Sequence, residues 1–144
     1  MIQVHGTAVA LGETAVLLRG PSGSGKSDLA LRLIDGGARL VADDRVDLTS
    51  KGTTLVASAP SPLTGLLEVR GLGILTFPHL KSAPIGLVVD LVAPQAIERL
   101  PERQCCDLAG VTLPLLSLAP FEVSAPAKLR LAVRMLTSMA SAVE

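Results

Sequence analysis

A glycine-rich octapeptide near the N-terminus has the residue types needed to hold the phosphates of a nucleotide. It consists of Gly20, Pro21, Ser22, Gly23, Ser24, Gly25, Lys26 and Ser27. This order fits G-x-x-x-x-G-K-[ST], in which the glycines let backbone N–H groups turn toward phosphate oxygens. Lys26 is expected to reach the β- and γ-phosphates, and the Ser27 hydroxyl to coordinate a Mg²⁺ ion that bridges them. The competing interpretation is a glycine-serine turn that matches the pattern by chance.

Two adjacent carboxylates follow the next apolar run. Asp43 and Asp44 come directly after Arg39–Ala42, which we expect to be a buried strand. A carboxylate at a strand end beside such a loop commonly serves the metal ion. One of the two can hold Mg²⁺ or its water, while the other takes a proton from an incoming hydroxyl. The alternative is a solvated turn, because aspartate favours turns.

The segments that must position these residues predict an α/β fold: a P-loop core with one mixed, mainly buried sheet. The chain has two Phe and neither Tyr nor Trp, so its core must be aliphatic, as in sheets buried on both faces. We expect strands at residues 2–10, 14–19, 39–42, 85–92 and 111–118, a hairpin over 46–58, and helices at 27–35 and 126–140. Residues 66–77 form an apolar run interrupted by Gly71 and Gly73, residues 93–107 read as irregular, and Pro114 favours an edge strand. A length of 144 residues fits a single domain, residues 1–144.

The composition argues against several classes of function. Formal net charge is zero, with 13 basic and 13 acidic residues, which is unlike a nucleic-acid binder. The scarcity of aromatic residues also weighs against a stacked base or sugar pocket. No apolar run is long enough to span a bilayer, and the N-terminus lacks the pattern of a signal peptide. The adjacent Cys105 and Cys106 are expected to be reduced thiols of a cytoplasmic protein.

Several segments together resemble the catalytic domain of the HPr kinase/phosphorylase family. They are His5-Gly6, the loop at 20–27, the segment 39–46, and the run Leu67, Glu68, Val69, Arg70, Gly71, Leu72, Gly73 and Ile74. The last run is very like the family signature L-E-[IV]-R-G-L-G-I, which is more specific than a phosphate-binding loop. The resemblance covers roughly residues 2–118. It implies a P-loop α/β core related to phosphoenolpyruvate carboxykinase, usually assembled as a hexamer.

The resemblance implies an ATP- and Mg²⁺-dependent kinase that phosphorylates a serine of the phosphocarrier HPr. It also implies a reverse-like reaction, in which inorganic phosphate attacks the phosphoserine and gives pyrophosphate. Asp44 matches the acid/base of the family, and Asp43 would support the metal. Glu68 matches a Mg²⁺ ligand, His5 a catalytic histidine, and Arg99 an arginine that stabilises charge on the transferred phosphoryl group.

Taken without the resemblance, three of these residues have simpler interpretations. His5 in an apolar strand is most often a core histidine. Glu68 and Arg70 could form an ordinary exposed ion pair, and Arg99 could be a solvated side chain.

The chain also departs from the family pattern. It begins almost directly at His5, without the extra N-terminal domain of full-length members, and residues 116–123 contain no arginine where the family has a basic loop. That loop is associated with phosphorolysis, so the kinase direction is the expectation carried forward. Two alternatives stay open: a regulator that binds ATP without transferring phosphate, and a P-loop kinase for a small molecule.

Overall fold

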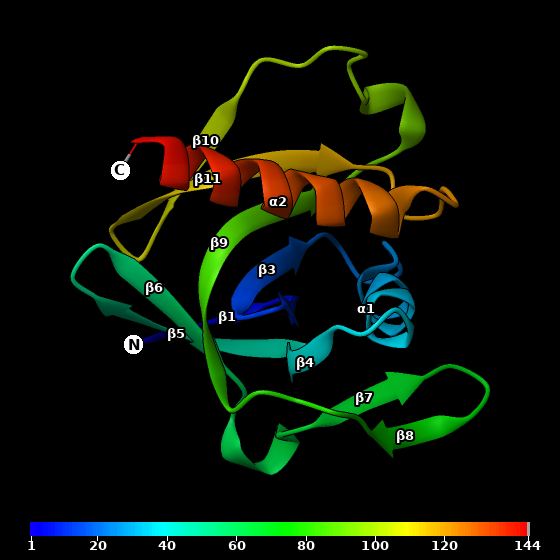
Figure 1. Ribbon diagram of the computed structural model, residues 1–144. Helices are drawn as coiled ribbons and strands as arrows, with labels where there is room; N and C mark the ends of the chain where they lie inside the picture. The colour runs from blue at the N-terminus through cyan, green and yellow to red at the C-terminus, as the bar shows by residue number, and fades with distance from the viewer. Residues whose placement is uncertain (144) are drawn as a thin grey trace.

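The computed structural model describes the backbone of residues 1–143 and the side chains of residues 1–136. Its sheet is built around one long curved strand, β9 (Ser82–Leu91), drawn in green in Figure 1. The first residues of β9 pair antiparallel with β6 (Thr54–Ser58). Residues 85–90 pair in parallel with β3 (Thr14–Arg19), and residues 88–91 pair in parallel with β11 (Val111–Leu118) on the other side. This strand therefore joins the two halves of the fold.

The other strands extend the sheet outward from β9. On one side, β3 pairs with β2 (Thr7–Leu11), and β2 pairs with β4 (Arg39–Ala42). On the other side, β6 pairs with β5 (Arg45–Lys51), and β5 pairs with β1 (Ile2–His5). A further strand, β10 (Gln104–Leu108), lies outside β11. Within residues 1–143, nine strands thus form one mixed, curled sheet, which agrees with the fold class expected from the sequence.

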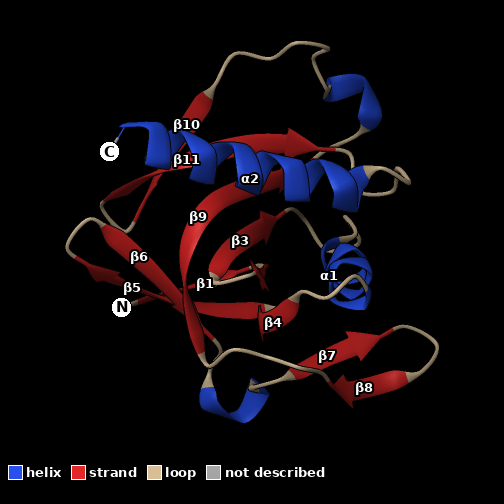
Figure 2. Cartoon of the chain, viewed as in Figure 1, coloured by secondary structure: helices blue, strands red, loops and turns tan. Residues whose placement is uncertain are grey.

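The central strands are buried on both faces, as their aliphatic composition predicts. Val16 and Leu18 point toward the helices α1 (Lys26–Asp35) and α2 (Ala125–Val143), and both helices contribute leucines to that core. The alternate residues Ala15 and Leu17 face the curled part of the sheet formed by β5 and β6. Figure 2 shows α2 running across β9 and β11, and α1 viewed nearly end-on beside β4. Because side chains alternate along a strand, one register fixes both cores.

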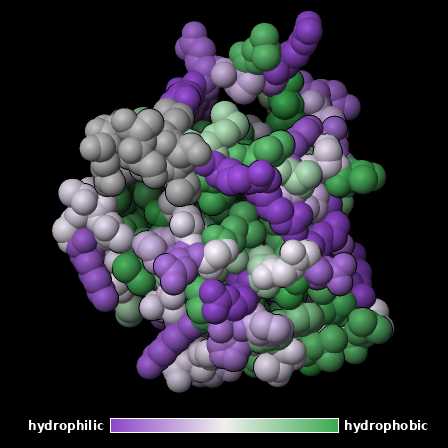
Figure 3. All heavy atoms as spheres, viewed as in Figure 1, coloured by the Kyte–Doolittle hydropathy of each residue, from purple (hydrophilic) through white to green (hydrophobic). Residues whose placement is uncertain are grey.

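A two-stranded hairpin stands apart from the main sheet. It consists of β7 (Leu66–Val69) and β8 (Gly73–Thr76), where the sequence predicted only an interrupted apolar run. Leu67 and Val69 pack against Leu40 of β4 and partly buried residues of α1. The tip of the hairpin exposes Leu72 and Ile74, and Figure 3 shows apolar surface at the lower right, where Figure 1 places this hairpin.

Three other sequence predictions need correction. The strand expected at 2–10 is divided at Gly6, whose N–H donates to the Asp44 carbonyl; a Cβ at Gly6 would lie 3.0 Å from the Leu18 carbonyl oxygen. Residues 93–107, expected to be irregular, contain most of β10 and a short 3-10 turn at Pro94–Ala96. The third correction is that β11 is not an edge strand, because β10 covers it; Pro114 is tolerated because pairing with β9 begins only at Leu115.

The helices agree with the prediction to within a few residues. α1 begins at Lys26, one residue before the expected start, and α2 runs through residue 143. Among the described residues, neither helix has the length and apolar character required to cross a membrane.

Candidate functional site

The glycine-rich segment connects the end of β3 to the start of α1, which confirms the predicted strand–loop–helix arrangement. Gly23 and Gly25 have φ angles of 82° and 99°, a region that glycine adopts without steric cost. Gly25 is the N-cap of α1, and it provides no side-chain hydrogen bond to the first turn. The first N–H groups of a helix have no partner within the helix, and with the helix dipole they attract anions. This loop therefore has the features of a phosphate site.

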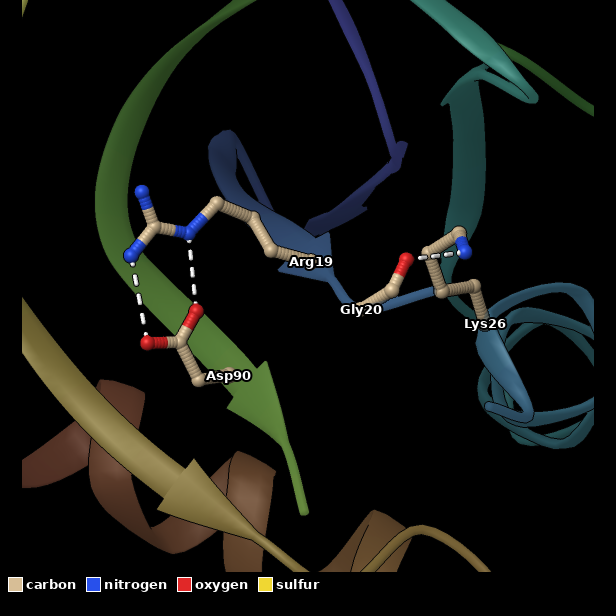
Figure 4. Close-up of polar contacts among 4 residues, drawn as sticks. All are labelled: Arg19, Gly20, Lys26 and Asp90. Atoms are coloured by element: carbon tan, nitrogen blue, oxygen red, sulfur yellow. Dashed lines mark hydrogen bonds and ion pairs between the residues drawn. The ribbon is translucent and has the colours of Figure 1, made fainter. Parts of the chain in front are cut away.

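The ammonium group of Lys26 lies over the same loop. Its Nζ donates to the carbonyl of Gly20 at 2.6 Å and to that of Pro21 at 3.0 Å. Figure 4 shows the side chain folded back toward Gly20. A phosphate at the loop would supply charged oxygens in place of these neutral carbonyls, and charge-assisted hydrogen bonds are the stronger kind.

One buried hydroxyl in the loop has no partner. Ser24 Oγ is buried and makes no hydrogen bond to any described residue. It lies so close to Gly20 that a Cβ there would approach it to 2.5 Å. An unpaired buried polar group requires a physical explanation, and a bound ligand is one. The loop therefore has an unused hydrogen-bonding group as well as an uncapped helix end.

The carboxylate of Asp43 joins three elements at the edge of the loop. Its Oδ1 accepts hydrogen bonds from Ser27 Oγ and from Thr7 Oγ1, both at 2.9 Å. Thr7, the first residue of β2, is the one fully buried polar side chain among the described residues. The hydroxyl and the carboxylate that the sequence assigned to a metal are thus in direct contact. Thr7 was not predicted from the sequence. The signal that could have identified it is a polar residue that follows a glycine inside an apolar run.

Asp44 lies at the turn between β4 and β5 in an unusual backbone conformation. Its φ angle is 69°, in the left-handed region that few residues other than glycine adopt. The turn is held by hydrogen bonds from Arg45 N to the Asp43 carbonyl at 2.8 Å and from Gly6 N to the Asp44 carbonyl at 3.2 Å. Such strain often accompanies functional sites. The side chain of Asp44 is exposed beside the loop, where an acceptor can reach it.

His5 is placed next to this turn. β1 and β5 pair so that His5 lies opposite Arg45, the residue that follows Asp44. The side chain is exposed, so it is not the core histidine of the simpler interpretation. The structure therefore brings the backbone of His5 together with Asp43 and Asp44 at one corner of the sheet.

The other two predicted residues lie outside this constellation. Glu68 on β7 and Arg99 in the segment before β10 are exposed, and neither makes a side-chain hydrogen bond or ion pair with residues 1–136. Nor do three or more His, Cys, Asp or Glu side chains of the described residues cluster closely enough to hold a metal ion. A divalent cation at this site would therefore need ligands from outside the chain, as Mg²⁺ does when it binds phosphate oxygens and water.

An ion pair fixes the strand that enters the loop. Arg19, the last residue of β3, donates Nε to Asp90 Oδ1 at 2.8 Å and Nη2 to Asp90 Oδ2 at 3.2 Å (Figure 4). The two side chains are 32% and 35% exposed. Hydrogen bonding to Asp90 raises the pKa of Arg19, although desolvation opposes the shift. This pair was not predicted from the sequence. The signal that could have indicated it is a charged residue at the end of each of two buried strands.

The candidate site lies at the carboxyl edge of the sheet. β3, β9 and β11 are parallel, so their carboxyl ends meet at one edge. β4 is antiparallel to β2, which is antiparallel to β3, so Asp43 after β4 reaches the same edge. Ligands of open α/β sheets bind at this edge. The fold thus gathers the loop and the acidic turn where a ligand is expected.

Comparison with known families decides the relationship of the chain. Residues 1–120 match the family model described as HPr Serine kinase C-terminal domain. The chain belongs to this family. The resemblance inferred from the loop, the acidic turn and the signature run is therefore confirmed.

Members of the HPr serine kinase family also appear among individual relatives. An HPr kinase/phosphorylase of Lactobacillus acidophilus is 44% identical over 97 residues, which cover 62% of this chain and 30% of that protein. An HPr kinase/phosphorylase of Geobacillus kaustophilus is 47% identical over 96 residues, 61% of this chain and 31% of that protein. The chain thus matches less than a third of the length of these curated relatives.

The fold agrees with that of a solved member of the HPr serine kinase family. The Hpr(Ser) kinase/phosphatase from Coxiella burnetii superposes with a TM-score of 0.86 at 25% sequence identity. The match covers 98% of this chain and 99% of that chain. The curled mixed α/β sheet described above is therefore the fold of this family.

Proposed function

We propose that this chain transfers the γ-phosphoryl group of ATP to a serine of an HPr-type phosphocarrier protein, with Mg²⁺ as cofactor. The observation that carries the proposal is the contact of Ser27 Oγ with Asp43 Oδ1 at 2.9 Å, directly beside the glycine-rich loop. A hydroxyl and a carboxylate in this position are the pair that holds Mg²⁺ in P-loop enzymes. Membership of the HPr serine kinase family supports the substrate class.

The residues would divide the work as follows. The loop N–H groups and Lys26 would bind the phosphates, while Ser27 and Asp43 would hold the cation. Bound there, Mg²⁺ would neutralise charge on the phosphate oxygens. Asp44 would accept the proton of the serine hydroxyl as the new O–P bond forms and the bond between the β- and γ-phosphates breaks. The exposed position of Asp44 leaves room for a protein substrate.

The remaining assignments follow the family resemblance. His5 is proposed to act near Asp44, since its strand places it beside that turn. Glu68 as a metal ligand and Arg99 as a charge stabiliser would require approach of their exposed segments to the bound nucleotide. We also expect a homo-oligomer, which light scattering on the purified chain would test. Phosphorolysis with inorganic phosphate is a second expectation.

A labelling assay tests the kinase proposal. The protein is mixed with γ-labelled ATP, Mg²⁺ and HPr-type proteins from the same cell, one of a sugar-uptake system and one of nitrogen regulation, and transfer of label is measured. Asp44→Asn should leave ATP binding nearly intact and abolish transfer. Asp35→Asn, an exposed aspartate at the last residue of α1, should change neither.

The outcomes separate the alternatives. An Asp44→Asn variant that still phosphorylates its substrate at the normal rate contradicts the role of Asp44. Tight ATP binding with no label on either phosphocarrier would favour the nucleotide-binding regulator, and label on a small metabolite instead would favour the small-molecule kinase. Transfer that requires pyrophosphate in place of ATP would change the donor and leave the acceptor assignment intact.

A further inference from the structure

A cavity opens beside the glycine-rich loop, at the carboxyl ends of β9 and β11. Its volume is about 550 Å³, within the range of roughly 300–1,000 Å³ that small-molecule sites occupy. The loop contributes Pro21 and Ser24, the segment after β9 contributes Val92 and Pro94, and the segment after β11 contributes Phe121. The cavity thus shares one wall with the candidate phosphate site, and its other walls are mainly apolar.

The cavity and the acidic turn lie on opposite flanks of the loop. In the sheet, β3 lies between β2 and β9; β4, which carries Asp43 at its end, is on the β2 side, and the cavity is on the β9 side. A triphosphate whose terminal phosphate faces the acidic turn must extend its other end away from that turn. The nucleoside is attached to that other end. The topology therefore directs the nucleoside toward the flank that contains the cavity.

Phe121 stands exposed at the wall nearest the loop. Its side chain is 68% exposed, although large apolar side chains are usually buried. The tip of the ring approaches the loop so closely that a Cβ on Gly25 would lie 2.9 Å from Phe121 Cζ. An aromatic ring adjacent to a phosphate site offers a face on which a base can stack.

The segment that carries Phe121 is held in place from α1. The Arg32 guanidinium donates to the carbonyl of Pro120 and, at 3.4 Å, to the carbonyl of Glu122. Arg32 is in turn paired with Asp28 in the first turn of α1, at 2.9 Å. The backbone on both sides of Phe121 is therefore held by the same helix whose N-terminus closes the loop. A backbone held in this way loses little freedom when a ligand binds.

We propose that Phe121 stacks on the base of the bound nucleotide and that this cavity holds its nucleoside. The inference rests on the proposed function, because the triphosphate must occupy residues 20–27. Scarcity of aromatic residues weighed against a base pocket in the sequence, but one of the two phenylalanines of the chain lies where such a pocket needs it. Apolar walls recognise the flat face of a base and not its edge, so ATP and GTP should bind similarly.

Calorimetric titration with two ligands tests the inference. Mg-ATP has a nucleoside and Mg-tripolyphosphate has none, so their difference isolates the cavity. Phe121→Ala should weaken ATP binding about tenfold and leave tripolyphosphate binding within about twofold, the scale expected for one stacked base. Phe121→Leu, which keeps an apolar side chain, should lose part of the same affinity. Val123→Ala, at a fully exposed position two residues away, should change neither ligand.

Every other outcome contradicts the inference, the proposed function or both. If Phe121→Ala lowers the affinity for both ligands equally, Phe121 only supports Gly25. If it lowers the affinity for neither, Phe121 is not part of the site. Both results overturn the inference. If both ligands bind the wild-type protein tightly and Phe121→Ala leaves the affinity for Mg-ATP unchanged, the inference alone is overturned and the proposed function stands. If neither ligand binds the wild-type protein and Lys26→Ala changes nothing, the proposed function fails, and the inference fails with it.

A spectroscopic measurement adds a readout that does not depend on affinity. The chain has two phenylalanines, and Phe77 packs against the Leu40–Leu67–Val69 cluster, away from the cavity. In protein labelled with ¹³C-phenylalanine, saturating Mg-ATP should shift the ring signals of Phe121 and leave those of Phe77 in place. Tripolyphosphate should produce a smaller shift. Equal shifts with the two ligands would contradict stacking by the base.

Discussion

A single oxygen atom, Oδ1 of Asp43, accepts hydrogen bonds from the hydroxyls of Thr7 and Ser27. Among the described residues, no side chain donates to its other oxygen, Oδ2. The two hydroxyls therefore fix the carboxylate while one oxygen stays open for a further partner. At the scale of single residues, this arrangement turns a generic acidic turn into a defined site.

The first residue-scale prediction concerns Thr7. Thr7→Val keeps the shape of this buried side chain and removes the hydroxyl that orients Asp43. We expect a loss of about 1 kcal/mol in the free energy of unfolding, the usual contribution of one hydrogen bond. Urea denaturation measures it, with Thr54→Val at an exposed strand position as the control. A variant as stable as the wild type would show that the bond does not hold Asp43 in place.

The second residue-scale prediction concerns the thiol of Cys106. Burial raises the pKa of this thiol; Arg19 opposes the shift, and Asp90, Asp107 and Cys105 reinforce it. A raised pKa reduces the thiolate fraction near neutral pH, and the thiolate is the reactive form. In a Cys105→Ser variant, the rate of alkylation of Cys106 should therefore rise at higher pH than that of a free thiol measured alongside. A profile that rises at the same or a lower pH would contradict the raised pKa.

Sequence reasoning at this scale found the residues that form motifs and missed those that support them. Lys26, Ser27 and Asp43 were predicted, and the structure places them at one loop. Thr7 was missed because its role depends on strand pairing, which brings together residues 36 positions apart. Local spacing contains no information on such a contact.

At the scale of elements, the glycine-rich loop is fixed both by its own φ angles and by its neighbour Phe121. Gly23 and Gly25 both have positive φ, but a Cβ at Gly23 would meet nothing within 4 Å. A Cβ at Gly25 would meet the ring of Phe121 at 2.9 Å. The two glycines thus share one conformational requirement and differ in one contact.

This difference predicts the outcome of two matched substitutions. Gly23→Ala should lower the free energy of unfolding by about 1 kcal/mol, because a positive φ angle costs alanine about that much. Gly25→Ala should cost more, and adding Phe121→Ala should return part of the excess. Thermal unfolding of the four proteins measures the difference. Equal effects of the two single substitutions would show that the ring does not press on the loop.

The strand end before the loop supports a second element-scale prediction. Arg19 and Asp90 form a two-point pair between neighbouring parallel strands. A double-mutant cycle with Arg19→Ala and Asp90→Ala should give a coupling of about 1 kcal/mol, at the upper end for partly exposed pairs because the geometry is bidentate. The cycle is measured by urea unfolding at low and high salt. A coupling indistinguishable from zero would remove this pair from the support of the loop.

At the scale of the whole molecule, the described residues form two large cores, one on each face of the central strands, beside the small Leu40–Leu67–Val69 cluster. The C-terminal helix α2 closes one of them through Leu129, while Leu131 on the same helix is half-exposed. Leu129→Ala should destabilise the fold by about 2–5 kcal/mol, and Leu131→Ala by much less. Chemical denaturation of the pair provides the comparison. Similar effects of the two substitutions would contradict the packing of α2.

Periodicity predicted most of the large elements, because long buried strands and amphipathic helices have strong patterns. The strand at 14–19, the hairpin over 46–58 and the helix α1 all formed where they were expected. Short exposed strands, such as β8 and β10, gave no clear pattern and were missed. The order of strands was beyond reach as well, since β9 pairs with segments from both ends of the chain.

The position of β9 has a consequence for how this protein is made. Arg19 and its partner Asp90 are 71 positions apart, so β3 has one unpaired flank until a distant part of the chain leaves the ribosome. A nascent chain that already contains the whole glycine-rich motif still has an unpaired strand edge, and such edges promote aggregation with other chains. Such distant pairing also slows folding. Under the proposed function, nucleotide binding would therefore depend on the completed sheet and would arise late in synthesis.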